Sequence, residues 1–534
     1  MRWHSGILIL LVLLVCPLVI AKSVPKFNPN QAIDRIFENE RSLASTLRNY
    51  SPMVETYLQR MQLDATMGYV PFEDRYFLGR VQFEQSNEEF YLDKRLIARM
   101  AGAFSKFYSL SPVGFASMIL VDRSGFDRHN YHLRYMQREF LGEVRCLVFE
   151  VTPRKDQPNR FKGAIWVEDE GYNVVRFNGS YGTFHIDSWR MNLRAGVWLP
   201  AVVYSEEFDS NKPQTRHARL KAQTRLWGYN LGPAAREQEF TDVVVDPQTA
   251  KDTTEHPDLS PLDIQRSWQR RAEDNVIDKL QEIGLVSPEG DVDKILRTVI
   301  NNLEVTNSIT LDPEVRCRIL PTAPIEIATI GHTILISRGL LDALPNEAAL
   351  ATVLAHALAH AALGHELDTS FAFNDRMVVP TYKQLPRFDF KHSAEQEREA
   401  DTLGLKILAN SPYKDDLAEA GLFLKVLAEF SGKVPNLTRA NLGEGLVTDN
   451  QVSFMAQVAS NAPRLEMDNP QQIVALPLGS RVKLDPWAGQ LKLVKAKPPR
   501  IYSAKDKLAL QVTPFSPYLT RVKAGHDSNP DDSN

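Results

Sequence analysis

Apolar and polar residues alternate in short runs through much of the first half of the chain. Between residues 71 and 231 these runs are rich in aromatic and β-branched residues and are separated by turn-forming residues. A period of two is typical of half-buried β-strands. The pattern predicts a β-rich domain over 71–231 that contains a curved antiparallel sheet. Its clearest strands are expected at 145–151, 161–167, 172–177, 197–204 and 219–229.

A helical period of apolar residues lies on both sides of this region. Residues 22–70 predict a helical segment, in which the apolar positions fit a pair of core-packing helices. The polar stretch 232–262, interrupted by prolines, predicts a linker. Helices are expected at 263–283, 292–303 and, further on, 417–430. The sequence thus predicts a multidomain α+β fold, in which a β-rich, half-barrel-like domain precedes a mainly helical one.

The two ends of the chain differ from the rest. Residues 1–21 combine a short basic start with an apolar run, which predicts a secretory signal peptide. Residues 472–515 predict a small β appendage, and 516–534 predict a tail that is expected to be disordered from Ala524 onward. No later apolar run is long enough to span a bilayer. We therefore expect an exported protein that is soluble in the periplasm or outside the cell. A lipoprotein at Cys16 is less favoured because Val15 stands where a lipobox needs a small residue.

Composition narrows the classes of function. The 534 residues are 43% hydrophobic and carry a formal net charge of −4, with Lys and Arg dispersed along the chain. A nucleic-acid-binding protein would concentrate basic residues on one face, so nucleic acid is not an expected partner. Of the three cysteines, Cys16 lies in the signal peptide, whereas Cys146 and Cys317 fall in different predicted domains. A disulfide framework and a cysteine zinc site are therefore not expected.

Residues 346–364 carry the pattern around which the second half of the chain is organised. The run is rich in Ala and Leu and apolar almost all round, so we expect a buried helix with Asn346 as its N-cap and Gly364 as its stop. His356 and His360 interrupt it at i and i+4, which places both imidazoles on one face, about 6 Å apart along the axis. Such a pair can bind one metal ion, although an isolated pair at this spacing is often structural.

A second motif follows at residues 393–401. Ser393 and Gln396 fit a capping box that starts a helix, and Glu397 and Asp401 then share one face at i and i+4. A carboxylate from Glu397 would complete a three-ligand zinc site with an open fourth position. Asp401 could then accept the outer N–H of a ligating histidine. The other histidines of this region have no spacing argument and are interpreted as structural: His332, His365 and His392.

Together the two motifs resemble those of gluzincin peptidases of the HtpX and CAAX prenyl endopeptidase type, metallopeptidase family forty-eight. Residues 263–471 carry the resemblance, which is greatest to the soluble, exported bacterial branch. That family has H-E-x-x-H on one helix and E-x-x-A-D on a later one, whereas this chain has His-Ala-Leu-Ala-His at 356–360 and an intact second motif at 397–401. The resemblance implies a zincin-like domain, one zinc ion and polypeptide substrates. It also implies that the strand at 334–337 edges the active site and can pair with an extended substrate.

Ala357 occupies the position of the family's general base. In that family the glutamate takes a proton from zinc-bound water, and a general base typically contributes about 10²- to 10⁴-fold to the rate. The first two acids that follow Ala357 in sequence are Glu366 and Asp368, and helix geometry keeps both away from the zinc water. A second departure is Ala462, which stands where the family often has a histidine. We predict that no catalytic residue remains and that hydrolysis is absent or greatly reduced, unless an acid from another segment supports residual activity.

Residues 161–167 and 172–179 of the predicted sheet are similar to the half-barrel of periplasmic lipoprotein carriers of the LolA type. This resemblance implies a concave face that can hold a lipid or a lipoprotein, although a packed sheet without a ligand fits the same pattern. Two functions of different classes remain open. One is an exported zinc metalloendopeptidase homologue with impaired hydrolysis, which acts on envelope or secreted proteins in protein quality control. The alternative is a non-enzymatic envelope chaperone or scaffold that binds extended polypeptide.

Overall fold

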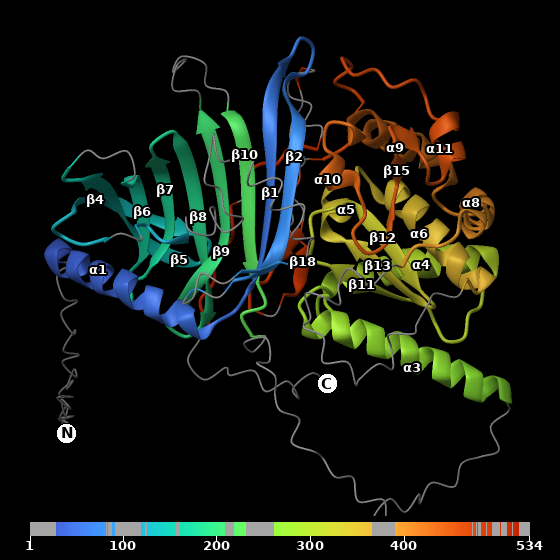
Figure 1. Ribbon diagram of the computed structural model, residues 1–534, viewed down its shortest axis with the longest axis horizontal. Helices are drawn as coiled ribbons and strands as arrows, with labels where there is room; N and C mark the ends of the chain where they lie inside the picture. The colour runs from blue at the N-terminus through green and yellow to red at the C-terminus, as the bar shows by residue number, and fades with distance from the viewer. Residues whose placement is uncertain are drawn as a thin grey trace, which may run out of the picture.

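The structure, a computed structural model, describes residues 28–522, with gaps at 82, 84–87, 91–118, 123–124, 156–159, 209–217, 231–260, 366–389, 473, 477, 479–481, 488, 494–501, 504–509 and 515. The predicted signal peptide, most of the predicted linker and tail, Glu366 and Asp368 lie outside the described residues. Figure 1 shows a large curved sheet beside a mainly helical part, with β1 and β2 at the boundary between them. The fold is α+β, as the sequence predicts.

The first part is one antiparallel sheet of 10 strands in the order β3-β2-β1-β10-β9-β8-β7-β6-β5-β4. Most neighbours in this sheet are also neighbours in sequence, but β1 pairs with β10 and so joins the two ends of the domain. All five strands expected from the alternating pattern are present. The strands are β1 Met53–Asp64, β2 Gly68–Val81, β3 Glu88–Phe90, β4 Tyr131–Leu141, β5 Val144–Pro153, β6 Lys162–Glu168, β7 Val174–Tyr181, β8 Phe184–Arg194, β9 Val197–Phe208 and β10 Ala218–Trp227.

Helix α1 (Pro29–Thr46) lies across one face of this sheet (Figure 1). Its apolar side, which includes Ile36 and Phe37, packs into a core with Phe149 and other side chains of the sheet. Glu40 of the same helix forms a buried ion pair with Arg190 of β8. A buried carboxylate needs such a partner, and this pair fixes the helix on the sheet.

Of the described residues in the segment 22–70, which the sequence predicts to be helical, only residues 29–49 are helical. A short 3-10 turn, Leu47–Asn49, ends α1, and residues 53–64 form β1 instead of a second helix. The first seven residues of β1 are all buried, which removes the usual alternation of buried and exposed positions. Since β1 lies at the boundary of the two parts, its apolar residues fit a helical period as well as a strand.

The second part surrounds a central helix, α6, with further helices and a small sheet (Figure 1). The helices expected at 263–283, 292–303 and 417–430 are present as α3, α4 and α9. The helices are α3 Pro261–Glu282, α4 Asp291–Asn307, α5 Arg338–Ala343, α6 Glu347–Leu363, α8 Ala394–Ala409, α9 Leu417–Ser431, α10 Pro435–Thr438 and α11 Ala456–Asn461. The strands are β11 Arg316–Leu320, β12 Glu326–Ile330, β13 Thr333–Ser337, β14 Glu444–Gly445, β15 Val447–Thr448 and β16 Gln451–Val452.

The ends of α6 and α8 follow the predicted capping residues. Asn346 accepts a hydrogen bond from the backbone N–H of Ala349 at 2.9 Å, and Gly364 ends α6 with a φ of +66°. This left-handed conformation costs glycine little because it has no Cβ. At the start of α8, the Gln396 side chain accepts the N–H of Ser393 at 2.9 Å, while the Ser393 hydroxyl accepts the N–H of Gln396 at 3.3 Å.

The resemblance implies that the strand at 334–337 can pair with an extended substrate, but β13 has a partner strand on each side. β13 lies between β11, with which it is parallel, and β12, with which it is antiparallel. β12 in turn pairs on its other side with β14, which comes from more than 100 residues further along the chain. Among the described residues the order is β11-β13-β12-β14, so both hydrogen-bonding sides of β13 are occupied by this chain.

Buried polar contacts join the sheet to the second part. Glu55 of β1 accepts a hydrogen bond from the Arg338 guanidinium of α5 at 2.8 Å, and both side chains are 2% exposed. Asp74 of β2 accepts the backbone N–H groups of Asn436 and Leu437 at the start of α10, at 3.0 and 2.8 Å. Each contact satisfies a buried charge of one part with donors of the other, so the two parts form a specific interface.

The C-terminal segment contains the expected small strands and contacts both parts. β17 (Val482–Leu484) and β18 (Leu491–Leu493) form an antiparallel pair. The N–H of Val482 donates to Asp342 of α5, and that of Val512 donates to Gln59 of β1. Among the described residues, none of the helices combines the length and the apolar character that crossing a membrane requires.

Candidate metal centre

Helix α6 brings its two histidines to one point inside the second part. His356 and His360 are each 1% exposed, and their Nε2 atoms lie 3.0 Å apart. The i, i+4 spacing therefore has the consequence expected from helix geometry. Two buried ring nitrogens held this close need either a shared proton or a cation between them.

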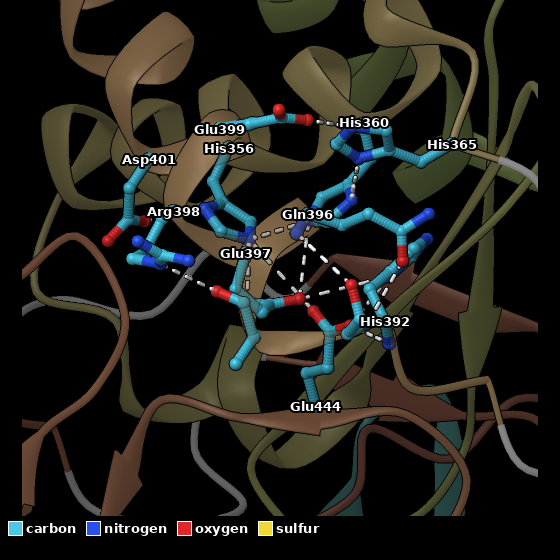
Figure 2. Close-up of polar contacts among 12 residues, drawn as sticks. His356, His360, His365, His392, Gln396, Glu397, Arg398, Glu399, Asp401 and Glu444 are labelled. Atoms are coloured by element: carbon cyan, nitrogen blue, oxygen red, sulfur yellow. Dashed lines mark hydrogen bonds and ion pairs between the residues drawn. The ribbon is translucent and has the colours of Figure 1, made fainter.

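Helix α8 supplies a carboxylate to the same point. Glu397 Oε2 lies 3.4 Å from His356 Nε2, and Glu397 Oε1 lies 3.4 Å from His360 Nε2 (Figure 2). The two helices approach closely at Gly404, where an added Cβ would lie 3.2 Å from the Cα of His356. The absence of a side chain at this position lets α8 bring Glu397 within reach of α6.

The outer ring nitrogens of both histidines have partners. His356 Nδ1 lies 2.8 Å from Asp401 Oδ1, as the second motif predicts. His360 Nδ1 lies 2.9 Å from His365 Nδ1, and His365 Nε2 lies 3.2 Å from Glu399. If His356 and His360 carry their protons on Nδ1 and His365 carries its proton on Nε2, every one of these contacts is a hydrogen bond. Both facing Nε2 atoms then present lone pairs, which is the state that a metal ligand requires.

Two residues of the site have no counterpart in the predicted motifs. Glu444 of β14 lies with its Oε2 3.9 Å from His356 Nε2. His392, interpreted from sequence as structural, stacks on the ring of His360 with centroids 3.8 Å apart. Its Nδ1 lies 2.6 Å from Glu444 Oε1, and its backbone N–H donates to the same oxygen at 2.9 Å. His392 therefore belongs to the site, as the residue that holds the Glu444 carboxylate (Figure 2).

The negative charges of the carboxylates in this cluster need either bound protons or a further cation to balance them. Burial would lower the pKa of His356, but the hydrogen bonds that Asp401 and Glu397 accept from its ring outweigh this effect and raise the pKa to about 9. Burial raises the pKa of Glu444, as do its hydrogen bond with Glu397 and the negative charge there. Without another cation, protons must therefore reside on groups that face one another at 3 to 4 Å.

The cluster fits a divalent metal better than it fits protons. The ligand atoms of His356, His360, Glu397 and Glu444 all lie within 4.8 Å of one another. Glu397 Oε1 is buried and accepts no hydrogen bond from the described residues. Zinc bonds to nitrogen and oxygen of 2.0–2.1 Å place tetrahedral ligands about 3.3 Å apart. The separations of 3.0, 3.4, 3.4 and 3.9 Å between the ligand atoms are close to this spacing.

The two alanines that depart from the expected motifs bring no polar group to the cluster. Ala357 is 1% exposed and belongs to the hydrophobic core of the second part. Ala462 follows α11 and faces α9, where a Cβ added to Gly421 would lie 2.5 Å from its own Cβ. Besides Glu397 and Asp401, the acid that lies beside the two motif histidines among the described residues is Glu444, which comes from β14 and not from position 357.

Residues 327–439 match the model of peptidase family M48. The matched segment contains both motif helices and begins in β12, but it ends before Glu444. It covers the part of the chain in which His356, His360 and Glu397 come together. The M48 match therefore supports the resemblance drawn from the two motifs, within this segment. No curated protein matches the chain in sequence.

The solved structures that resemble the chain match its N-terminal half, which contains the large sheet. A domain from Vibrio parahaemolyticus named for outer membrane lipoprotein sorting has 9% identity and a TM-score of 0.22, over 36% of this chain and 91% of its own. A LolA superfamily protein from Nitrosomonas europaea has 11% identity and a TM-score of 0.20, over 38% of this chain and 91% of its own. The MucA/MucB complex of Pseudomonas aeruginosa has 9% identity and a TM-score of 0.13, over 37% and 93%. These scores are too low to support an argument about function.

Proposed function

We propose that this protein is an exported homologue of zinc metalloendopeptidases that binds one zinc ion and hydrolyses peptide bonds poorly or not at all. The observation that carries the proposal is the contrast between an intact ligand set and a missing base. The ligand atoms of His356, His360 and Glu397 converge, and Asp401 lies 2.8 Å from the outer ring nitrogen of His356. Position 357, between the histidines, carries a buried alanine.

The proposed metal residues have separate tasks. His356, His360 and Glu397 would hold the ion, and Asp401 would keep His356 in the tautomer that binds it. When bound, zinc polarises a carbonyl group and lowers the pKa of water. Hydrolysis also needs a group that accepts and returns a proton, a contribution of about 10²- to 10⁴-fold that Ala357 cannot make. Binding of zinc and loss of activity are therefore compatible.

The clients and the location are proposed from the resemblances. A peptidase-like domain implies polypeptide as the ligand of the second part, and the sequence of residues 1–21 favours export. A lipid or lipoprotein is the proposed ligand of the sheet. A non-enzymatic envelope chaperone or scaffold would use the same ligand classes without any hydrolysis. Complete loss of activity together with retained zinc would favour this second role.

Metal content and digestion of an unfolded substrate together test the proposal. Full-length protein should contain one zinc per chain by elemental analysis, and His360→Gln should lower this content, whereas His332→Gln should not. Digestion of casein by the same preparation should equal that in the presence of a chelator. Absence of zinc would remove the ligand assignment. Digestion that the chelator abolishes would refute the loss of hydrolysis.

A further inference from the structure

Glu444 reaches the proposed metal ligands from a segment that neither motif contains. Its carboxylate belongs to β14, and its Oε2 lies 3.9 Å from His356 Nε2. It is one of the four groups whose ligand atoms all lie within 4.8 Å of one another. The side chain is 12% exposed, so it points into the protein and not into solvent. Zinc peptidases that hydrolyse need an open position beside three protein ligands, and a fourth carboxylate changes that count.

The backbone around Glu444 is firmly held. Gly445 and Glu444 pair with Glu326 and Ile327 of β12. The buried carboxylate of Glu326 accepts three consecutive N–H groups, those of residues 441, 442 and 443, at 2.8, 2.8 and 3.2 Å. Burial raises the pKa of Glu326, and these three hydrogen bonds oppose the rise. The segment 441–445 is therefore an integral part of the sheet beside the cluster.

The Glu444 side chain is also oriented, through His392. Its Oε1 accepts two hydrogen bonds from His392, one from the backbone N–H and one from Nδ1. The tautomer of His392 that carries its proton on Nδ1 makes this contact a hydrogen bond to Oε1. With Oε1 occupied in this way, Oε2 is the oxygen that faces His356. This is the usual arrangement for a carboxylate ligand, in which one oxygen binds the ion and the other is fixed by a donor.

We propose that Glu444 is a fourth protein ligand of the metal and closes the position that a zinc peptidase keeps open for water. The proposal rests on the proposed function, because it requires that the cluster binds zinc. It adds a second, independent reason for impaired hydrolysis besides the alanine at 357. It also predicts a metal that is bound tightly and shielded from small ligands.

Zinc affinity tests the ligand role. Full-length wild-type protein and Glu444→Gln are compared by competition with a chromophoric chelator. The amide keeps the size of the side chain but is a poor zinc ligand, so we expect affinity to fall at least about 10-fold, the lower range for disturbing groups around a metal. Glu395→Gln is the matched control, because Glu395 is an exposed glutamate of α8 and lies outside the cluster. It should leave affinity unchanged.

Access to the metal gives a second readout that does not depend on activity. Cobalt replaces zinc, and acetohydroxamate, a small bidentate metal ligand, is added while the visible spectrum is recorded. The wild-type spectrum should not change, whereas that of Glu444→Ala should change with saturable dependence on acetohydroxamate. Equal zinc affinity in the wild type and Glu444→Gln, with acetohydroxamate bound by both, would overturn the proposal and leave the carboxylate beside an open site. Absence of metal from the wild type would overturn the proposed function as well.

Discussion

Replacement of Arg338 by methionine should destabilise the junction between the two parts more than any surface change. The guanidinium is 2% exposed and lies between two carboxylates, with Glu55 at 2.8 Å and Asp342 at 3.0 Å. Its Nε also donates to the carbonyl oxygen of Pro321. Removal of the guanidinium takes from both buried carboxylates the cation that pairs with them directly, and Arg225 is a further cation that interacts with them. Breaking a buried pair in this way costs about 3–5 kcal/mol.

Replacement of the carboxylate partner Glu55 should lower the free energy of unfolding by less than replacement of Arg338. In Glu55→Gln the amide oxygen can still accept from the Tyr76 hydroxyl and from the N–H of Ala323, both of which donate to Glu55 Oε1. Arg338 also keeps Asp342. We expect a cost of about 1–3 kcal/mol, the range for disturbing a buried hydrogen-bonded group. Because the two residues share one contact, the double variant should lose about 1–3 kcal/mol less than the sum of the single variants.

Equilibrium unfolding in urea measures these differences, with tryptophan fluorescence and circular dichroism recorded on the same samples. Arg35→Met is the matched control, since the Arg35–Glu38 pair is 66% and 68% exposed and should leave the unfolding midpoint unchanged. A loss below about 1 kcal/mol in Arg338→Met, or strict additivity in the double variant, would show that the buried pair does not hold the junction. Separate transitions for the two probes in Arg338→Met, against one in the wild type, would show in addition that it couples the two parts.

Three further outcomes are expected. The double variant Ala357→Glu/Glu444→Ala should digest casein at least about 10²-fold faster than the wild type, and a chelator should abolish this digestion. The control Ala357→Gln/Glu444→Ala should show no such increase. Equal rates in all three proteins would contradict the argument from the missing base. Zinc affinity should rise with pH between about 6 and 9, because the pKa of His356 is about 9 in the metal-free protein and its proton must leave before zinc binds; affinity independent of pH in competition titrations would exclude this linkage. Asp74→Ala should lower the free energy of unfolding by about 1–3 kcal/mol, because the buried N–H of Leu437 loses its acceptor; Asp74→Asn, which keeps an acceptor, should lose less in the same urea experiment.

The parts of the site that lie on helices could be predicted from the sequence. Asn346 and Gly364 set the ends of α6, and Ser393 with Gln396 starts α8. Once those ends are fixed, the i, i+4 spacing puts each pair of functional side chains on one face. The meeting of the two faces follows from the motifs only through the family resemblance.

The remaining site residues could not be found in this way. Glu444 lies on a strand of two residues, 47 positions after Glu397, and a single residue in so short an element shows no periodicity. His392 lies outside α8, just before its N-cap, so it has no helical spacing to either motif. That Glu444 and His392 belong to the site becomes apparent only when the sheet order β13-β12-β14 is known. Long-range strand pairing is the kind of contact that local patterns do not contain.

The incorrect prediction of a helix at residues 53–64 has a similar cause. Val54, Tyr57, Leu58 and Met61 fit the helical spacing i, i+3, i+4 and i+7, and they also fit a strand that is covered on both faces. Periodicity separates the two structures only where one face is exposed to solvent. The burial of β1 against the second part is therefore what made its pattern ambiguous.

The pairing of β14 with β12 has a consequence for how a polypeptide could enter. A client chain that pairs with Glu326 and Ile327 of β12 on the side away from β13 must first displace residues 444 and 445, which pair with them. The same displacement would withdraw the Glu444 carboxylate from the histidines. Exposure of β12 and removal of Glu444 from the metal would then occur together. A client that binds by strand addition would itself determine when the metal centre is open to solvent.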